Sequence, residues 1–319
     1  MTGPRPLVSG PVLLLGGTGT IGRATAAALR AEGFDVVALV RPGAPRPANC
    51  RIVEGSASDP AVVVHAVEGC AAVVSCLASR TGAPEDARAI DRDAHRLVLQ
   101  AAMDAGVGRF VLLSAICVQK PRLAFQQAKL EFEAALQAAP IGWTIVRPTA
   151  YFKSLSGQVD RVRAGKPFLV FGDGRLTACK PISDADLGRF LALCLNDPAT
   201  VRQVLPVGGP GPAITPLDQV AMLERLTGAP VRVKRVPLAV MDAIVGGLAL
   251  LGRFVPTLAA KAELARIGRY YATESMLVWD GARYDADATP EFGSDRLEDH
   301  YAALLRGDVG DDRGAHRVF

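Results

Sequence analysis

The stretch that decides the fold of this chain is Gly16-Gly17-Thr18-Gly19-Thr20-Ile21-Gly22. It follows the apolar run Val12–Leu15 and opens the alanine-rich segment 20–32, so its glycines lie between a strand and a helix. This spacing permits a tight turn, a close approach of the backbone to a pyrophosphate, and close packing of helix on strand. Free N–H groups at the start of a helix also favour a negative charge. We therefore predict a dinucleotide site, rather than a turn alone, at Gly16, Thr18, Gly19, Thr20, Ile21 and Gly22.

Apolar strand patterns alternate with helix patterns through the first half of the chain. The expected strands are 12–15, 34–40, one that begins at 51–53, 71–77, 110–114 and 143–146, and the expected helices are 20–32, 86–105 and 125–138. This alternation is typical of a parallel sheet that is covered by helices on both faces and joined by right-handed crossovers. The predicted fold class is therefore α/β, a Rossmann-type doubly wound parallel sheet with a smaller C-terminal substrate lobe.

The alternation ends after Pro148. A helix near 184–196 and a strand near 203–207 are expected to return to the main sheet. Helices near 217–226 and 238–251 are expected in the second lobe. The predicted parts are a dinucleotide-binding domain with a returning segment, a substrate-binding lobe in two pieces and a frayed tail: 10–150 with 176–207, 151–175 with 208–306, and 307–319.

The charge of the chain restricts the classes of partner. The 319 residues carry a net charge of +4 with a pI near 8.8, and the basic residues are scattered. Because no basic run interleaved with aromatic residues occurs, nucleic acid is not expected as a partner. A modest positive surface favours instead an anionic cofactor or a substrate that carries a carboxylate.

Cysteine and histidine usage predicts no metal site. The six cysteines form no C-x-x-C pair, which is typical of buried thiols in a reducing cytoplasm rather than of iron–sulfur or zinc sites.

The longest apolar stretch, 238–251, contains Asp242 and is shorter than the about 20 residues that span a bilayer. We expect a soluble cytoplasmic protein without a transmembrane segment or signal peptide. Contact of the stretch 238–251 with a membrane surface or an apolar substrate stays open.

The end of the second strand indicates which dinucleotide binds. An enzyme that uses NAD would carry an acidic residue there for the ribose 2′-hydroxyl, but this chain has Arg41. A guanidinium can bind a 2′-phosphate through paired charged hydrogen bonds, so NADPH is the predicted cofactor, with a solvated surface charge as the alternative. Asp59 is placed near the adenine. The ribose and nicotinamide end is expected at Cys76, Leu77, Ala78 and Ser79.

The expected catalytic helix lacks a phenol. A ketoreductase helix of this kind carries Tyr-x-x-x-Lys, whereas here the residues are Phe125 and Lys129. Phenylalanine cannot donate a proton to a carbonyl oxygen, which indicates a carbon–carbon double bond as the target. Phe125, Lys129, Phe132 and Leu136 share one helix face. The Lys129 ammonium must therefore find a polar partner, contact the cofactor ribose and the substrate, or extend to solvent.

Further candidates lie at the ends of later strands. Ser114 ends the fifth strand, at the edge where ligands bind such sheets, and is expected to orient the substrate or the carboxamide, or to cap the loop. Tyr151 follows the sixth strand and is an alternative proton donor, or else a packed aromatic ring. The expected substrate contacts are Phe125, Tyr151, Phe152 and Lys180.

The glycine loop, Arg41 and the helix of Lys129 resemble the atypical short-chain reductases of the isoflavone-reductase-like group. Several longer runs are similar to those of the divinyl chlorophyllide 8-vinyl-reductase family, and they lie within about residues 12 to 290. These runs are 114–121, 128–133, 147–155, 171–174, 179–183 and 203–211.

The resemblance implies NADPH-dependent reduction of the C8 vinyl group of a magnesium tetrapyrrole to ethyl, in chlorophyll or bacteriochlorophyll biosynthesis. Hydride addition to the outer vinyl carbon leaves a carbanion that spreads into the macrocycle, so no carbonyl oxygen needs a proton. Lys129 would then hold the ribose and deliver the final proton or stabilise the anion. The resemblance also implies a bacterial cytoplasmic form, with contact to the periphery of photosynthetic membranes left open. The alternatives are another alkene or enol-ether reductase of this group and a non-catalytic NADP(H) sensor.

Overall fold

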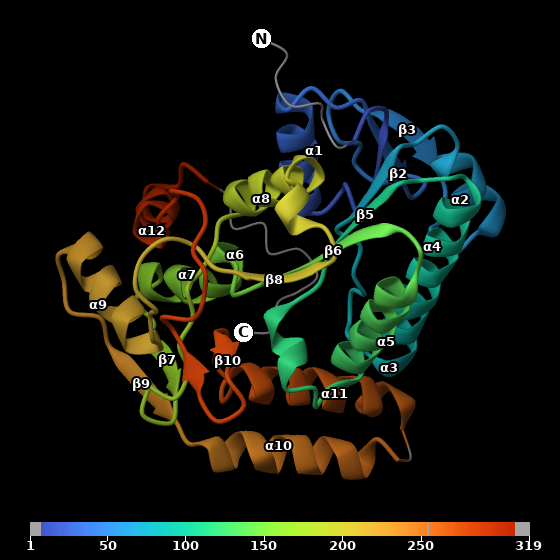
Figure 1. The fold of residues 1–319 in the computed structure, drawn as a ribbon. Helices are drawn as coiled ribbons and strands as arrows, with labels where there is room; N and C mark the ends of the chain where they lie inside the picture. The colour runs from blue at the N-terminus through green and yellow to red at the C-terminus, as the bar shows by residue number, and fades with distance from the viewer. Residues whose placement is uncertain (1–7, 254, 310–319) are drawn as a thin grey trace. The chain divides into compact units, whose positions relative to one another are not determined.

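The computed structural model describes residues 8–253 and 255–309. These residues form two compact units (Figure 1). Unit 1 consists of the described part of Met1–Ser79 together with Pro84–Pro148 and Asp184–Val207. Unit 2 consists of Arg80–Ala83, Thr149–Ser183 and the described part of Gly208–Phe319.

Unit 1 is built on a seven-stranded sheet in the order β3-β2-β1-β4-β5-β6-β8. Every neighbouring pair of these strands is parallel. The strands are β1 Val12–Leu15, β2 Val36–Val40, β3 Arg51–Glu54, β4 Ala72–Ser75, β5 Arg109–Leu113, β6 Gly142–Pro148 and β8 Gln203–Val207. The strand order reverses at β1, so the carboxyl ends of β1 and β4 form the place where doubly wound sheets bind ligands. The predicted fold class is confirmed.

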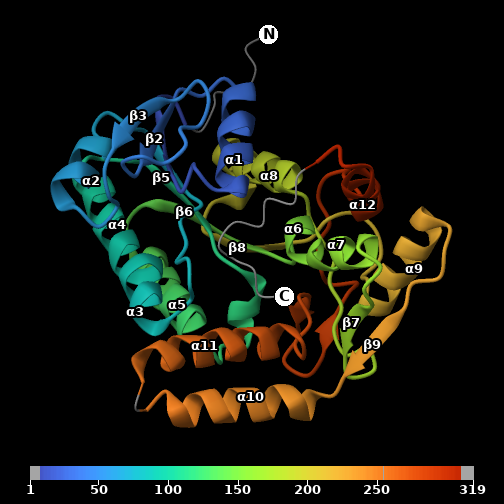
Figure 2. The same cartoon turned by 180° about the vertical axis from the view of Figure 1, so that it is seen from behind.

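Helices cover both faces of this sheet (Figures 1 and 2). The helices of unit 1 are α1 Thr20–Ala31, α2 Pro60–Val67, α3 Pro84–Ala87, α4 His95–Asp104, α5 Ala124–Ala138 and α8 Asp184–Asn196. α1 packs on α8 on one face. On the other, the inward side chains of α2, α4 and α5 join alternate strand residues such as Leu13 and Leu15 in one hydrophobic core. This alternation follows from the two-residue period of a strand.

The segment 86–105 differs from the single regular helix that its pattern predicts. It consists of α3, a π-helical segment Arg88–Ala94, and α4. A π-helical turn holds more residues than an α-helical turn and is frequent at functional sites. Here it brings the polar residues Asp91 and His95 to the buried side of the helix, where each is about 1% exposed.

Unit 2 has its own hydrophobic core, in which Tyr301 is fully buried and donates its hydroxyl to the Leu155 carbonyl oxygen. A parallel strand pair joins β7 Phe168–Phe171 to β9 Val233–Val236, and β7 contributes Phe168 and Val170 to this core. The small antiparallel pair consists of β10 Val278–Trp279 and β11 Tyr284–Asp285. The helices are α6 Phe152–Leu155, α7 Gly157–Arg163, α9 Pro216–Thr227, α10 Leu238–Leu251, α11 Pro256–Tyr271 and α12 Leu297–Arg306.

None of the helices in the described part of the chain combines the length and apolar character needed to cross a membrane. The predicted helix at 238–251 is confirmed as α10. Most of the predicted frayed tail, residues 310–319, lies outside the described residues.

Candidate cofactor and active site

The glycine turn is pressed against the backbone around it. Gly16 has φ +71°, and a Cβ added there would lie 2.5 Å from the Cys76 carbonyl oxygen. A Cβ added at Gly22 would lie 2.1 Å from the Gly16 carbonyl oxygen. Both positions therefore require glycine, because any side chain would push the loop away from β4 and from its own helix.

The start of α1 is suited to an anion. Its N-cap residue is Gly19, and neither a capping side chain nor an acidic residue occupies the first turn. Thr20 and Ile21 open the helix directly after this cap, and Thr18 lies beside them in the turn. A helix start of this kind presents backbone N–H groups and the positive end of the helix dipole. A pyrophosphate fits this cradle.

Arg41 and Asp59 follow β2 and β3. Arg41 is exposed, and its guanidinium forms no ion pair within the described residues, so it is available to an anionic group. Asp59 is the N-cap of α2, where its Oδ1 accepts hydrogen bonds from the N–H groups of Ala61 at 3.0 Å and Val62 at 3.4 Å. The structure therefore gives Asp59 a helix-capping role.

A buried serine–histidine pair holds the loop after β4 in place. His95 Nδ1 lies 2.8 Å from the Ile90 carbonyl oxygen and Nε2 lies 2.8 Å from Ser75 Oγ. Burial, reinforced by the charge of Lys129, lowers the pKa of His95 to about 4, so the ring is neutral. Since a carbonyl oxygen only accepts, Nδ1 carries the proton and Ser75 donates to Nε2. Ser75 Oγ in turn accepts from the Leu77 N–H at 3.3 Å, which fixes the predicted nicotinamide-side loop.

In the same loop the Cys76 thiol lies 3.5 Å from the Thr25 hydroxyl of α1. Burial raises the pKa of this thiol to about 12, so it is not a nucleophile at neutral pH. Ala78 is exposed and Ser79 is buried. The glycine turn and the loop 76–79 are therefore adjacent walls of one site within unit 1.

Lys129 forms an ion pair with Asp91 of the π-helical segment, with 2.9 Å between Nζ and Oδ1. Ser79 donates its backbone N–H to the same oxygen at 3.3 Å. Burial of Asp91 opposes ionisation, but the attraction of Lys129 and these hydrogen bonds outweigh it, so the pKa of the carboxyl is below its usual value. The second oxygen, Oδ2, is buried and has no partner in the described residues. A buried unpaired carboxylate oxygen beside a cofactor loop is suited to accept a hydrogen bond from a ligand hydroxyl.

The helix α5 that carries Lys129 is fixed at its first turn by Gln126. The Gln126 side chain accepts from the Arg122 and Leu123 N–H groups at 2.7 and 2.9 Å and donates to the Cys117 carbonyl oxygen at 3.1 Å. Phe132 is fully buried, whereas Phe125 and Lys129 are partly exposed. On the face of α5 that Phe125, Lys129 and Phe132 share, the exposed end therefore carries Phe125 at the position where a ketoreductase has its phenol.

Ser114 has a partner of its own. Its hydroxyl donates to Glu133 Oε1 at 2.5 Å, and Glu133 also forms an ion pair with Arg147. Ser114 is 4% exposed and the Glu133 side chain 2%. This group joins the end of β5 to α5 and β6, so Ser114 is held inside unit 1 by Glu133.

The remaining predicted residues belong to unit 2. Tyr151 is half-buried and pairs with Ile182 in an isolated parallel bridge. The Phe152 ring is buried and lies 5.6 Å from the His300 ring. The Lys180 ammonium lies 2.7 Å from Glu291 Oε1 and 3.2 Å from the Thr289 carbonyl oxygen, which places it in a structural ion pair.

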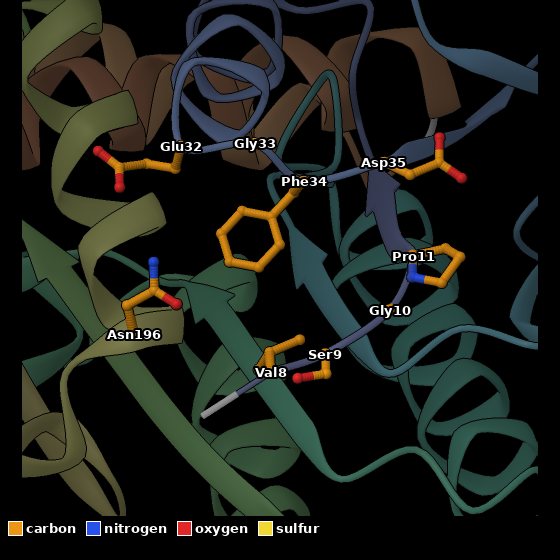
Figure 3. A pocket seen from close by; sticks show the side chains of 9 residues that line it. All are labelled: Val8, Ser9, Gly10, Pro11, Glu32, Gly33, Phe34, Asp35 and Asn196. Carbon is orange, nitrogen blue, oxygen red and sulfur yellow. The ribbon is translucent and has the colours of Figure 1, made fainter. Parts of the chain in front are cut away.

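A hollow at the other edge of the sheet is not the cofactor site. It is lined by residues that precede β1 and β2 and by the end of α8, as Figure 3 shows for Glu32, Phe34, Asp35 and Asn196. These residues lie at the amino ends of the strands, whereas the glycine turn lies at the carboxyl ends. In the part of the chain that the structure describes, no group of His, Cys, Asp and Glu is arranged to hold a metal ion.

Asp91, His95 and Glu133 are the site residues that reasoning from the sequence missed. Asp91, His95, Val98 and Ala102 have spacings typical of one helix face, and all are buried. Two polar residues on an otherwise apolar face are a signal for paired buried groups, and this signal was present in the sequence.

Comparisons with known proteins agree with this geometry. An NAD(P)H-binding family model matches residues 16–198. The chain is 43% identical over 338 residues to the chloroplastic divinyl chlorophyllide a 8-vinyl-reductase of Cucumis sativus, covering 97% of this chain and 79% of the relative. The enzyme of the same name from Oryza sativa subsp. indica is 44% identical, with 97% and 82% covered. The NADPH complex of the quinone oxidoreductase QOR2 from Escherichia coli shares the fold, with a TM-score of 0.66 and 17% identity over 92% of this chain and 99% of that one.

Proposed function

The chain belongs to the divinyl chlorophyllide a 8-vinyl-reductase family, and from this premise we propose that it reduces the C8 vinyl group of divinyl chlorophyllide or protochlorophyllide to ethyl with NADPH. The observation that carries the proposal is the lysine of α5 without its phenol, in an otherwise complete nucleotide cradle. Phe125 stands where carbonyl chemistry needs a proton donor, while Lys129 is kept and paired with Asp91. Such a site suits hydride addition to a carbon–carbon double bond.

The cradle supports binding of NADPH. Gly16, Gly22 and the uncapped start of α1 suit the pyrophosphate, and the exposed guanidinium of Arg41 suits a 2′-phosphate. On the other side, Lys129 Nζ and the unpartnered Asp91 Oδ2 together offer a donor and an acceptor. This pair matches the two hydroxyl groups of a ribose, each of which donates and accepts. When bound, the reduced nicotinamide supplies a hydride equivalent.

The reaction balances without a carbonyl. One hydride would add to the outer carbon of the vinyl group, and the π bond electrons would move to the inner carbon and the macrocycle. One proton would then form the second new C–H bond, at the inner carbon. The Lys129 ammonium, which lies beside the loop after β4 through its ion pair with Asp91, can stabilise this negative charge. If Lys129 gave up its proton, Asp91 would remain buried and unpaired, which costs several kcal/mol, on the order of 3–5. We therefore assign Lys129 to ribose binding and charge stabilisation. As the proton donor we propose Tyr151, because a phenol hydroxyl can donate a proton.

The direct test is turnover of purified protein with NADPH and 3,8-divinyl chlorophyllide a, followed by chromatography of the monovinyl product. Formation of that product, with NADH a much poorer donor, is the expected result. Tight NADPH binding without any product would reject the vinyl-reductase proposal and would favour the NADP(H) sensor. Turnover of other alkenes in preference to the chlorophyllide would identify a different reductase of the same fold.

Variants separate the proposed roles. Lys129→Met should raise the NADPH KM and lower kcat, because both ribose binding and charge stabilisation are lost. Tyr151→Phe should lower kcat and leave the NADPH KM unchanged. Lys166→Met, at an exposed lysine of unit 2, is the matched control and should change neither constant. Hydride transfer at the normal rate in Lys129→Met would remove this residue from the mechanism.

A further inference from the structure

The helix α10 exposes an apolar stripe that no described residue of the chain covers. Val240, Ile244 and Leu251 lie at spacings of four and seven residues, so they share one face, and they are 47, 51 and 55% exposed. Leu250 beside them is 58% exposed. An added Cβ at Gly247, on the same face, would meet nothing within 4 Å. Contiguous exposed apolar surface of this kind marks an interaction site.

The opposite side of α10 is already used. Leu238, Met241, Val245 and Leu248 are half-buried, and Figures 1 and 2 both show α10 lying along α11. An ion pair between Asp242 of α10 and Arg269 of α11 joins the two helices. The pairing with α11 thus accounts for one apolar face and leaves the stripe of Val240, Ile244, Leu250 and Leu251 open.

The charge around α10 is strongly positive. Residues 232–269 carry seven basic and two acidic side chains, a net charge of +5, while the whole chain has a net charge of only +4. Both acidic residues are neutralised locally, Asp242 by Arg269 and Glu263 by Arg266. The net positive charge of the segment 232–269 therefore comes mainly from residues that flank α10, Arg232, Lys234, Arg235 and Arg253.

Unpaired cations lie at both ends of the apolar stripe. Lys234 and Arg235 of β9 lie a few residues before α10, and Arg253 lies two residues after its end. Lys261 lies in the first turns of α11, near Ala259, whose backbone a Cβ at Gly252 would approach to 2.9 Å. All four side chains are exposed and form no ion pair with any residue that the structure describes.

We propose that α10 lies flat on an anionic lipid bilayer, with its apolar stripe among the acyl chains and the flanking Lys and Arg side chains on the lipid phosphates. An apolar helical face bordered by basic residues is the pattern of helices that bind at membrane interfaces. The 14 residues of α10 extend about 21 Å, less than the about 30 Å of a hydrocarbon core, so the helix rests on the bilayer rather than spanning it.

Charge argues against a second copy of this chain as the occupant. A twofold contact through α10 would place the same surface on both sides of the interface. The +5 segment of one copy would then face the +5 segment of the other, and such like-charge contact is unfavourable. An anionic bilayer has the opposite charge and an apolar interior, and it satisfies both features of the surface. This inference does not depend on the substrate proposed above.

Vesicle flotation of the full-length protein tests the proposal. Wild type should float with phosphatidylcholine vesicles that contain about one-third phosphatidylglycerol, at least tenfold more than with phosphatidylcholine alone. Removal of each flanking cation should weaken binding about fivefold at low salt, since each basic residue near an anionic surface contributes about that factor. The double variant Lys234→Gln and Arg235→Gln should therefore bind about 25-fold more weakly.

The apolar contribution is tested with Ile244→Gln and Leu251→Gln, each expected to reduce flotation at least fivefold. The matched control is Val64→Gln, which changes a 59% exposed valine of α2 in unit 1 and should not alter flotation. Thermal melts of each variant confirm that the fold is kept.

Several outcomes would overturn the proposal. Equal flotation with neutral and anionic vesicles would reject the charge argument, and unchanged flotation of the Ile244 and Leu251 variants would reject the stripe. A concentration-dependent dimer that Ile244→Gln dissociates, in a protein that does not float, would identify a second copy as the occupant. If Ile244→Gln and Leu251→Gln raised the substrate KM in the absence of membranes and left flotation unaltered, α10 would be identified as a substrate cover instead.

Discussion

Acid should weaken unit 1 through His95, whose buried ring stays neutral in the folded protein. Its pKa in the folded state is about 4, against an ordinary value of 6.5. Between these two values the unfolded chain binds a proton that the folded chain does not, so stability falls as the pH falls. This lowering of the His95 pKa reduces the free energy of unfolding by about 3 kcal/mol below pH 4 and by about 2 kcal/mol at pH 5, relative to neutral pH.

The assay is urea unfolding at pH 7.5 and pH 5, followed by tryptophan fluorescence. Trp143 lies in β6 of unit 1 and Trp279 in β10 of unit 2, so the background variant Trp279→Phe restricts the signal to unit 1. His95→Gln removes the titrating group while keeping an acceptor for Ser75. We expect this variant to be less stable than wild type at pH 7.5. At pH 5 the difference in the free energy of unfolding between the two proteins, which we call the gap, should be about 2 kcal/mol smaller, because only wild type loses stability through His95.

The comparison isolates one histidine, because all other titrating groups are common to both proteins. A gap that is the same at both pH values would show that His95 is protonated in the folded state or that its burial is not maintained. It would also remove the assignment of Ser75 as the donor to Nε2, and with it the account of how the loop after β4 is fixed.

Arg41→Ala should raise the NADPH KM about 10- to 100-fold and leave the NADH KM unchanged, because hydrogen bonds between charged groups contribute about 1.5–3 kcal/mol; equal effects on both cofactors in steady-state kinetics would refute the 2′-phosphate role. Gly22→Ala should abolish NADPH binding in calorimetry, because its Cβ would lie 2.1 Å from the Gly16 carbonyl oxygen; normal affinity would contradict the proposed cradle. Gly188→Ala should destabilise unit 1 by about 1–3 kcal/mol in urea unfolding, since its Cβ would lie 2.7 Å from the Ala24 backbone; an unchanged midpoint would show that α1 and α8 can separate without cost.

The helix α2 was not predicted, although the sequence contains signals for it. The helix α2 begins with Asp59 as its N-cap and Pro60 at its first position, both typical of a helix start. Its interior, Val62-Val63-Val64, is β-branched and resembles a strand, so the pattern gave no prediction there. Packing of Val63 and Val67 in the core of unit 1 outweighs this weak local preference.

The sequence by itself determined the alternation of strands and helices, the glycine turn, Arg41 at the end of β2, and the loss of the phenol at Phe125. These features depend on periodicity and on local backbone rules, which a single chain displays directly. Only the tertiary structure decided that Lys129 pairs with Asp91, that Ser114 pairs with Glu133, and that His95 is neutral. Each of these depends on which side chains become neighbours after burial, and the cost of leaving a buried polar group unpaired selects partners that lie far apart in the sequence.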